Sequence, residues 1–187
     1  MLTHNVALMR LGGENKLNKN VSTLAIQKNI TFREPNENDG SDMYTLVKNT
    51  KVLDLNSPYS YLMWAKYFHK TSIIAEINEQ LVGFISGFIQ PQSPHTLFVW
   101  QVAVDESQRG KGLATNLLMN LLKQLEKKDI RYVEATVTPS NVPSHRFFKG
   151  LANKLETGCE ITECFSSDQF PHGSHEPELT YRIGPLK

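Results

Sequence analysis

The sequence predicts an α/β fold, and three observations support that class. An apolar, β-rich run at 97–104 is typical of a buried strand, and it leads through a polar turn and two glycines into a long amphipathic pattern. Strand-like and helix-like segments follow one another in the order β-α-α-β-β-β-α-β-α-β-β. The chain has 187 residues, enough for one domain with a sizeable core but too short for two. We therefore expect one α/β domain organised around the strand at 97–104.

The domain is expected to occupy residues 30–187, preceded by an N-terminal extension at 1–29. Residues 1–11 are mildly apolar but lack the basic start and cleavage signal of a secretory peptide. The Asn- and Lys-rich segment that follows has no sustained period, which favours a mobile tail. A loosely packed additional helix is the alternative.

The first half of the domain is expected to form a strand, two helices and a hairpin. An alternating strand at 30–33 is followed by a helix with its apolar positions at Met43, Leu46 and Val47. Ser57 is the expected N-cap of a second helix, which starts with a proline and ends near residue 68. The hairpin strands are expected at 71–77 and 81–89, with a turn at 78–80 and a Pro- and Ser-containing break at 91–94.

The second half is expected to contain two helices and three strands. A stripe of leucines between Leu113 and Leu125 predicts the helix that follows the glycines. A second helix is expected through Phe147, Phe148 and Leu151. The strands are expected at 132–138, near 155–164 and at 178–183, with a polar loop at 171–173.

Composition excludes several functional classes. A net charge of +1 lacks the excess of positive charge that is typical of proteins binding nucleic acid or membrane surfaces. No apolar run approaches the ~20 residues that span a bilayer. Cys159 and Cys164 are too few for a disulfide scaffold, which favours the cytoplasm, and both are expected to be buried apolar residues. With His172 and His175 they fit no standard zinc-finger spacing, so we expect no metal.

The turn after the central strand has the features of an anion site. Gly110 and Gly112 let the backbone approach a ligand closely, and the first N–H groups of the next helix lack intrahelical partners. Arg109 and Lys111 add positive charge suited to a pyrophosphate. The segment fits neither a Walker loop, which needs Gly-Lys-Ser/Thr, nor a Rossmann turn, which needs three glycines. An ordinary connection with a solvated basic turn is the alternative.

The same segment resembles the acetyl-CoA pyrophosphate loop of the GNAT superfamily of N-acetyltransferases, Gln/Arg-x-x-Gly-x-Gly/Ala. It matches as Arg109, Gly110, Lys111, Gly112, Leu113 and Ala114. The resemblance covers roughly residues 30–184. It implies the GNAT fold, a mixed central sheet with a splayed pair of parallel strands flanked by helices. It also implies acetyl-CoA as cosubstrate.

The resemblance implies a cofactor site between the splayed strands. The Val102 N–H would polarise the thioester carbonyl, and the backbone of 102–104, through Ala103 and Val104, would hold the pantetheine. A helix along the cofactor would contribute Asn141, Ser144 and Phe147. The tyrosine that often serves as general acid in this superfamily is replaced here by Phe148. Tyr44, Tyr59, Tyr61, Tyr67 and Tyr181 are the other tyrosines considered for that role.

Five strings, 53–57, 83–86, 97–104, 136–141 and 175–176, resemble the branch of the superfamily that acetylates L-2,4-diaminobutyrate in ectoine biosynthesis. This closer resemblance implies acetyl transfer to the 4-amino group of that substrate. It also implies a cytoplasmic homodimer. It says nothing of residues 1–29.

The acceptor amine must be held and deprotonated, because a primary alkyl amine has a pKa near ~10.4. Asp54, His175, Glu176 and Glu134 are the candidate acceptors of that proton. We expect Asp54 to anchor the α-ammonium, Trp100 to form a wall of the cleft, and His175 or Glu176 to close the other side. Plain structural roles are the alternatives: a loop aspartate, a core tryptophan and a solvated turn.

Three functions remain open from the sequence. They are the diaminobutyrate acetyltransferase, an N-acetyltransferase for another small amine or peptide, and a catalytically silent acetyl-CoA sensor. Because no catalytic Ser-His or Cys-His pairing stands out in the sequence, and neither cysteine lies near the glycine loop, direct transfer in a ternary complex is expected rather than an acyl-enzyme.

Overall fold

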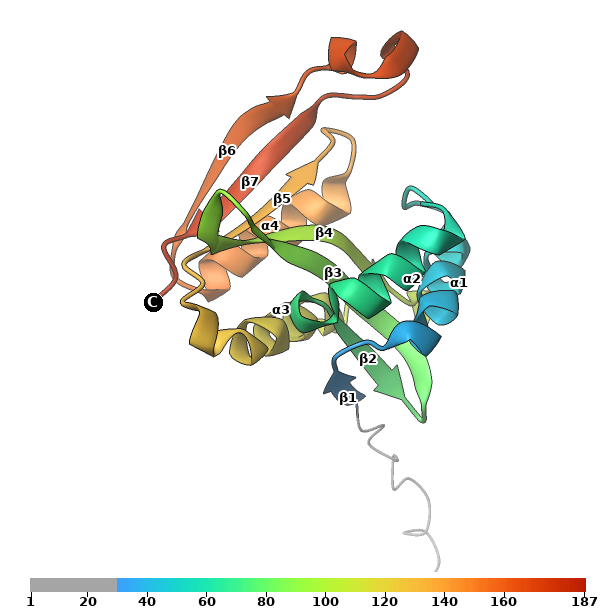
Figure 1. Ribbon diagram of the computed structural model, residues 1–187. Helices are drawn as coiled ribbons and strands as arrows, with labels where there is room; N and C mark the ends of the chain where they lie inside the picture. The colour runs from blue at the N-terminus through green and yellow to red at the C-terminus, as the bar shows by residue number, and fades with distance from the viewer. Residues whose placement is uncertain (1–29) are drawn as a thin grey trace, which may run out of the picture.

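The computed structural model describes residues 30–187, and the predicted extension at 1–29 lies outside the described residues. Seven strands form one sheet in the order β1-β2-β3-β4-β5-β7-β6 (Figure 1). The strands are β1 Ile30–Arg33, β2 Ile73–Ile77, β3 Gln80–Gln90, β4 Ser93–Val104, β5 Tyr132–Val137, β6 Gly158–Phe165 and β7 Glu178–Gly184. The helices are α1 Gly40–Thr50, α2 Pro58–Tyr67, α3 Leu113–Gln124 and α4 Val142–Lys154. Short 3-10 turns are η1 Glu37–Asp39, η2 His69–Thr71, η3 Glu106–Gln108, η4 Glu126–Lys128, η5 Ser167–Gln169 and η6 Pro171–Gly173.

The predicted order of elements is confirmed, and the local signals explain several boundaries. The Ser57 hydroxyl accepts a hydrogen bond from the Ser60 N–H and caps α2, whose first residue is Pro58. Asn78 and Glu79 both have positive φ, as the tight turn of a two-residue hairpin requires.

Two boundaries differ from the prediction by more than two residues. The expected break at 91–94 is too long, because β4 already begins at Ser93. Pro94 is tolerated there because pairing with β5 starts only at Thr96, so no ladder bond on that side needs a proline N–H. The strand expected near 155–164 starts at Gly158, because α4 continues to Lys154 and Leu155 is its C-cap.

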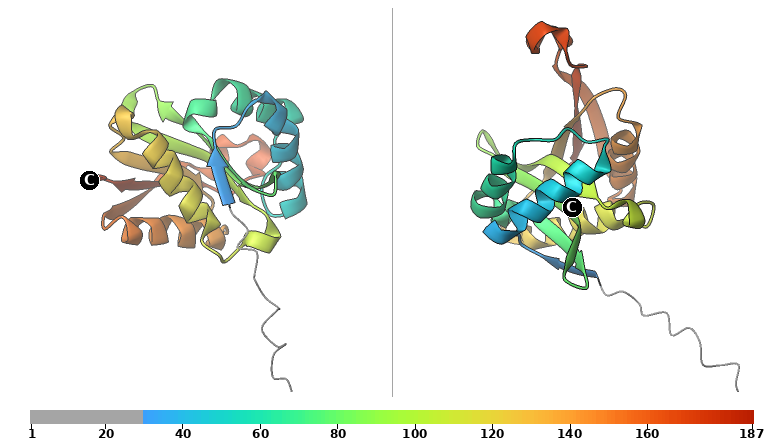
Figure 2. Two further views of the ribbon diagram at one scale, coloured as in Figure 1. Left: turned by 90° about the horizontal axis from the view of Figure 1, so that it is seen from below. Right: turned by 90° about the vertical axis from the view of Figure 1, so that its right-hand side faces the viewer.

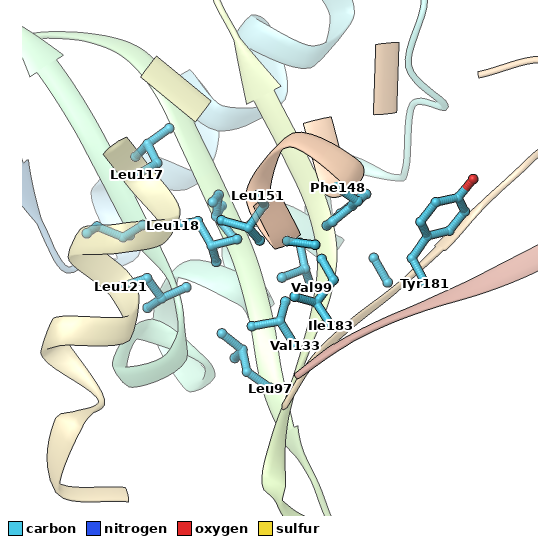
Figure 3. Close-up of a cluster of buried hydrophobic side chains, with 14 of the residues drawn as sticks. Leu97, Val99, Leu117, Leu118, Leu121, Val133, Phe148, Leu151, Tyr181 and Ile183 are labelled. Carbon is cyan, nitrogen blue, oxygen red and sulfur yellow. The ribbon is translucent and has the colours of Figure 1, made fainter. Parts of the chain in front are cut away.

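Helices cover both faces of the sheet. The larger core cluster lies under α3 and α4, and Figure 3 shows leucines of α3 and Phe148 and Leu151 of α4 packed over β4, β5 and β7. A smaller cluster on the opposite face joins α1 and α2 to Ile74, Phe84 and Ala103. The further views in Figure 2 show the β6–β7 hairpin projecting beyond these layers.

The parallel pair β4–β5 is splayed, as predicted. The two strands pair only from Thr96 to Phe98 on β4 and from Tyr132 to Glu134 on β5. Beyond this point β4 continues beside β3 to Val104, and β5 continues beside β7 to Val137 (Figure 1). The backbone edge of β4 from 99 to 104 is therefore open toward β5.

A β-bulge lies in β4 at the start of this open edge. Gln101 pairs with Ser86 and Val99 pairs with Gly87, so Trp100 is an extra residue without a partner on β3. The bulge breaks the alternation of side chains, and both Trp100 and Gln101 point toward the α1–α2 face. Val102 and Val104 then pack against the core on the α3–α4 face.

Cysteine burial was predicted wrongly. Cys164 is exposed and Cys159 is only partly buried, because both lie on β6, an edge strand with no helix packed over most of its length. Within residues 30–187 no helix is long and apolar enough to cross a bilayer.

Candidate active site

The loop between β4 and α3 has the geometry of an anion site. Gly110 and Gly112 adopt φ values of 73° and 76°, a left-handed conformation that side chains rarely tolerate, and the space beside each is open. Leu113 is buried and Ala114 follows it, so their backbone N–H groups, rather than their side chains, face the loop. Among the described residues no side chain caps α3, whose first intrahelical bond runs from the Asn116 N–H.

The basic residues of this loop lie beside its free N–H groups. Arg109 is exposed, and its Nε lies 3.4 Å from the Val104 carbonyl oxygen, which places the guanidinium at the end of the open edge. Lys111 is exposed between the two glycines. The helix dipole, the N–H groups and both cations therefore favour a pyrophosphate at one place.

The alternation of hydrogen bonds along β4 turns the N–H groups of two residues toward the opening between β4 and β5. The Asp105 N–H donates to the Val82 carbonyl on β3 at 2.9 Å. Because antiparallel strands alternate, Ala103 also bonds toward β3, whereas the N–H groups of Val102 and Val104 point toward the open side. This is the orientation that a donor to a thioester carbonyl and to a pantetheine amide requires.

Helix α4 borders the same opening. Its N-cap is Asn141, whose Oδ1 accepts a hydrogen bond from the Ser144 N–H at 3.2 Å. Phe147 is partly exposed and its ring lies 4.8 Å from that of Phe148. Phe148 is 4% exposed and belongs to the core, so the position of the superfamily's usual tyrosine has a packing role here.

Acidic residues from two distant segments meet around one histidine. His175 lies between η6 and β7, and its Nε2 is 4.0 Å from Asp54 Oδ2 and 3.8 Å from Glu178 Oε1. Asp54 comes from the α1–α2 loop, with a side chain that is 97% exposed. The structure therefore brings Asp54 and His175 together with Glu178, and the roles expected of Asp54 and His175 stay predictions.

The hydrogen bonds of His175 determine which ring nitrogen is available. Nδ1 lies 2.6 Å from the Glu176 carbonyl oxygen, which only accepts, so Nδ1 carries the proton. In the neutral ring Nε2 is then the acceptor, and it points into the carboxylate cluster. Phe170 stacks on the imidazole at 4.4 Å and holds it in this orientation.

Trp100 is half exposed at the bulge of β4 and is not a core residue. Its ring stacks on that of Trp64 from α2 at 5.8 Å. The neighbouring Gln101 Nε2 donates to the Asp54 carbonyl oxygen at 3.0 Å, which ties the α1–α2 loop to β4. The indole therefore forms a wall beside the segment that carries Asp54.

Residues 40–152 match the family model of the acetyltransferase (GNAT) family. The L-2,4-diaminobutyric acid acetyltransferases of Halalkalibacterium halodurans and Marinococcus halophilus are both 52% identical to this chain over 157 residues. The match covers 84% of this chain and 82% and 91% of the respective relatives. The chain belongs to the diaminobutyrate acetyltransferases of the GNAT family.

A solved structure supports the same assignment for this acetyltransferase. The diaminobutyrate acetyltransferase EctA from Paenibacillus lautus, in complex with its substrate L-2,4-diaminobutyric acid and coenzyme A, is similar with a TM-score of 0.80 and 42% identity. The similarity covers 84% of this chain and 96% of that one. Ard1 from Thermoplasma volcanium, at 20% identity and a TM-score of 0.66, shares the fold. The resemblance noted in the sequence is confirmed.

Glu178 is the residue of this acetyltransferase that sequence analysis missed. Its Oε2 is buried without a hydrogen-bond partner among residues 30–187, and burial raises the pKa of its carboxyl. A buried acceptor without a partner is costly unless a ligand supplies a donor. Its signal in the sequence, an acid two residues after the His-Glu pair, was read only as the start of a strand.

Other candidate residues of the acetyltransferase have structural partners. Glu134 is bonded to Arg182 and accepts from Gln90, so it is not available as a base. Tyr181 is buried, and its hydroxyl is bonded to His145 Nδ1. Within residues 30–187 no three His, Cys, Asp or Glu side chains are arranged to hold a metal ion.

Proposed function

We propose that the protein transfers acetyl from acetyl-CoA directly to the 4-amino group of L-2,4-diaminobutyrate within a ternary complex. The observation that carries this proposal is the cluster of Asp54, Glu178 and His175 on the acceptor side of the splayed strands. The substrate has two amines and one carboxylate, and an acidic cluster suits its ammonium groups. The relatives' names, and the diamino acid and coenzyme A in the Paenibacillus lautus structure, support the same substrate pair.

The acidic groups select which nitrogen reacts by holding the amino-acid head. Asp54 is the exposed anchor for the α-ammonium, and Glu178 offers a buried oxygen that still requires a donor. Trp100 covers the aliphatic chain on the other side. With the head so fixed, only the 4-amino group extends toward the open edge of β4.

The chemical step uses His175 and the backbone of β4. His175 Nε2 accepts the proton of the 4-ammonium, directly or through water, and the freed amine attacks the thioester carbon. The Val102 N–H stabilises the oxyanion that develops on the carbonyl oxygen. The C–N bond forms, the C–S bond breaks, and the sulfur leaves as the thiolate of CoA, which takes up the second proton that the attacking nitrogen releases.

Product analysis with Asp54→Asn tests the proposal. The wild type should give only the N4-acetyl product by NMR, and Asp54→Asn should raise KM for the diamino acid at least ~10-fold, as expected for a charge-assisted contact of ~1.5–3 kcal/mol. Asp42→Asn, an exposed acid on α1, is the matched control and should change little. Acetyl on the 2-amino group, or an unchanged KM in Asp54→Asn, would contradict the assignment.

Steady-state kinetics test the direct mechanism in the same preparation. The cysteines lie on β6, separated from β4 by β5 and β7, so neither is placed to take the acetyl group. Initial rates at varied concentrations of both substrates should give intersecting lines. Parallel lines, or an acetylated cysteine in the mass spectrum, would indicate an acyl-enzyme.

We further propose a cytoplasmic homodimer that serves ectoine biosynthesis under osmotic stress. The outer edge of β6 is unpaired in the described part of the chain, and Ile161 and Phe165 are exposed on this strand. A long exposed edge of this kind presents unpaired backbone groups that can pair with the edge of another chain. Sedimentation velocity should give twice the chain mass of 21.2 kDa, and a monomer at micromolar concentration would refute the dimer.

A further inference from the structure

The loop between β5 and α4 is held from the β6–β7 side at two points. The Ser140 N–H donates to Glu176 Oε2 at 3.0 Å. His145, in the first turn of α4, bonds to the Tyr181 hydroxyl through Nδ1 and donates from Nε2 to the Pro139 carbonyl oxygen at 3.0 Å. The start of α4 and the segment before β7 are therefore connected by hydrogen bonds across 36 residues of sequence.

Glu176 bonds toward both proposed substrate sites through different atoms. Its carboxylate accepts from Ser140, the residue directly before the α4 N-cap Asn141. Its carbonyl oxygen accepts from His175 Nδ1 at 2.6 Å and so fixes the acceptor histidine. Hydrogen bonds from Ser140 hold the pKa of the Glu176 carboxyl below its usual range, so the contact is charge-assisted at neutral pH.

We propose that Glu176 is a positioning residue that couples the two substrate sites, so that coenzyme A and the diamino acid bind cooperatively. The inference rests on the proposed function, because it takes the opening beside α4 as the cofactor site. A cofactor that orders the start of α4 also orders Glu176, and through its carbonyl it orders His175. The second ligand then binds a site that is already ordered, so its binding loses less conformational entropy. Linkage requires the effect to be reciprocal.

The experiment uses coenzyme A without acetyl, which lets both ligands bind without reaction. Calorimetry gives the Kd of the diamino acid with and without saturating coenzyme A, and the ratio is the coupling factor. In the wild type we expect a factor of at least ~5, within the range usual for coupled sites. Glu176→Ala should reduce it below ~2, whereas the Kd of coenzyme A alone should change less than ~3-fold. Glu176→Gln, whose amide oxygen can still accept from Ser140, should keep most of the coupling.

Glu163→Ala is the matched control, because it removes an exposed glutamate from β6 of the same hairpin. It should leave the coupling factor unchanged. A wild-type factor of one, or full coupling in Glu176→Ala, overturns the proposal. A higher Kd for the diamino acid in Glu176→Ala with an unchanged coupling factor also overturns it, since that result indicates direct contact between Glu176 and the substrate. Wild-type turnover with both substrates is measured beside it, and its absence would instead count against the proposed function.

Discussion

Gly112→Asp is expected to weaken acetyl-CoA binding at least ~100-fold, or about 2.7 kcal/mol. The carboxylate would occupy the place of the pyrophosphate, next to the unpaired N–H groups at the start of α3. Two lost charge-assisted hydrogen bonds of ~1.5–3 kcal/mol each account for this magnitude. A Cβ on Gly112 meets nothing within 4 Å, and Asp is one of the few residues that adopt a positive φ such as its 76°, so the fold should be retained. Calorimetry with acetyl-CoA measures the effect.

Gly112→Asn tests whether the charge or the size of the new side chain causes the loss of acetyl-CoA affinity. Asn and Asp have nearly the same size, and both tolerate the left-handed conformation of this position. We expect Gly112→Asn to bind acetyl-CoA at least ~10-fold more tightly than Gly112→Asp. Equal affinity of all three proteins would show that the loop does not bind the pyrophosphate.

His175→Asn is expected to lower kcat by ~10²–10⁴-fold, the usual contribution of a positioned general base. Asn can still donate to the Glu176 carbonyl oxygen in place of Nδ1, so the local turn is preserved. It provides no basic nitrogen at the position of Nε2, beside Asp54 and Glu178. Single-turnover rates at saturating substrates measure the chemical step.

His172→Asn provides the matched control for this variant. His172 lies three residues earlier in the same loop, is exposed and has a φ of 59°, which asparagine accepts. Its kcat should stay within twofold of the wild type. If His175→Asn also stays within threefold, another group removes the proton from the amine.

The candidate cofactor loop could be located from the sequence because its signals are contiguous. The glycines, the basic residues and the first two residues of α3 lie within six neighbouring positions, so local backbone geometry alone indicates an anion site. The strand before them is also predictable, because its apolar run is broken only by Gln101. Only the bulge within it was missed, since an inserted residue leaves no mark on an apolar pattern.

The acceptor side could be predicted only in part, because its residues come from distant segments. Asp54 and His175 are 121 positions apart and meet only when the β6–β7 hairpin approaches the α1–α2 loop. Glu178 looked like an ordinary strand residue because its burial depends on tertiary packing. Cys164 was misplaced for the converse reason, since strand character does not reveal that β6 is an edge.

Because Trp100 is an extra residue in β4, the strand has one side-chain alternation before the bulge and another after it. Before it, side-chain alternation places Leu97 and Val99 in the core, and after it the phase of the backbone directs the Val102 N–H into the splay. Under the proposed function, a substitution at Trp100 would change the wall beside the acceptor amine without rotating the Val102 N–H that would donate to the thioester. A deletion there would turn every following residue to the other face of the sheet. If these roles hold, acceptor preference can change by exchange of the side chain at the bulge, whereas the length of this strand is constrained by the position that acyl transfer requires of the Val102 N–H.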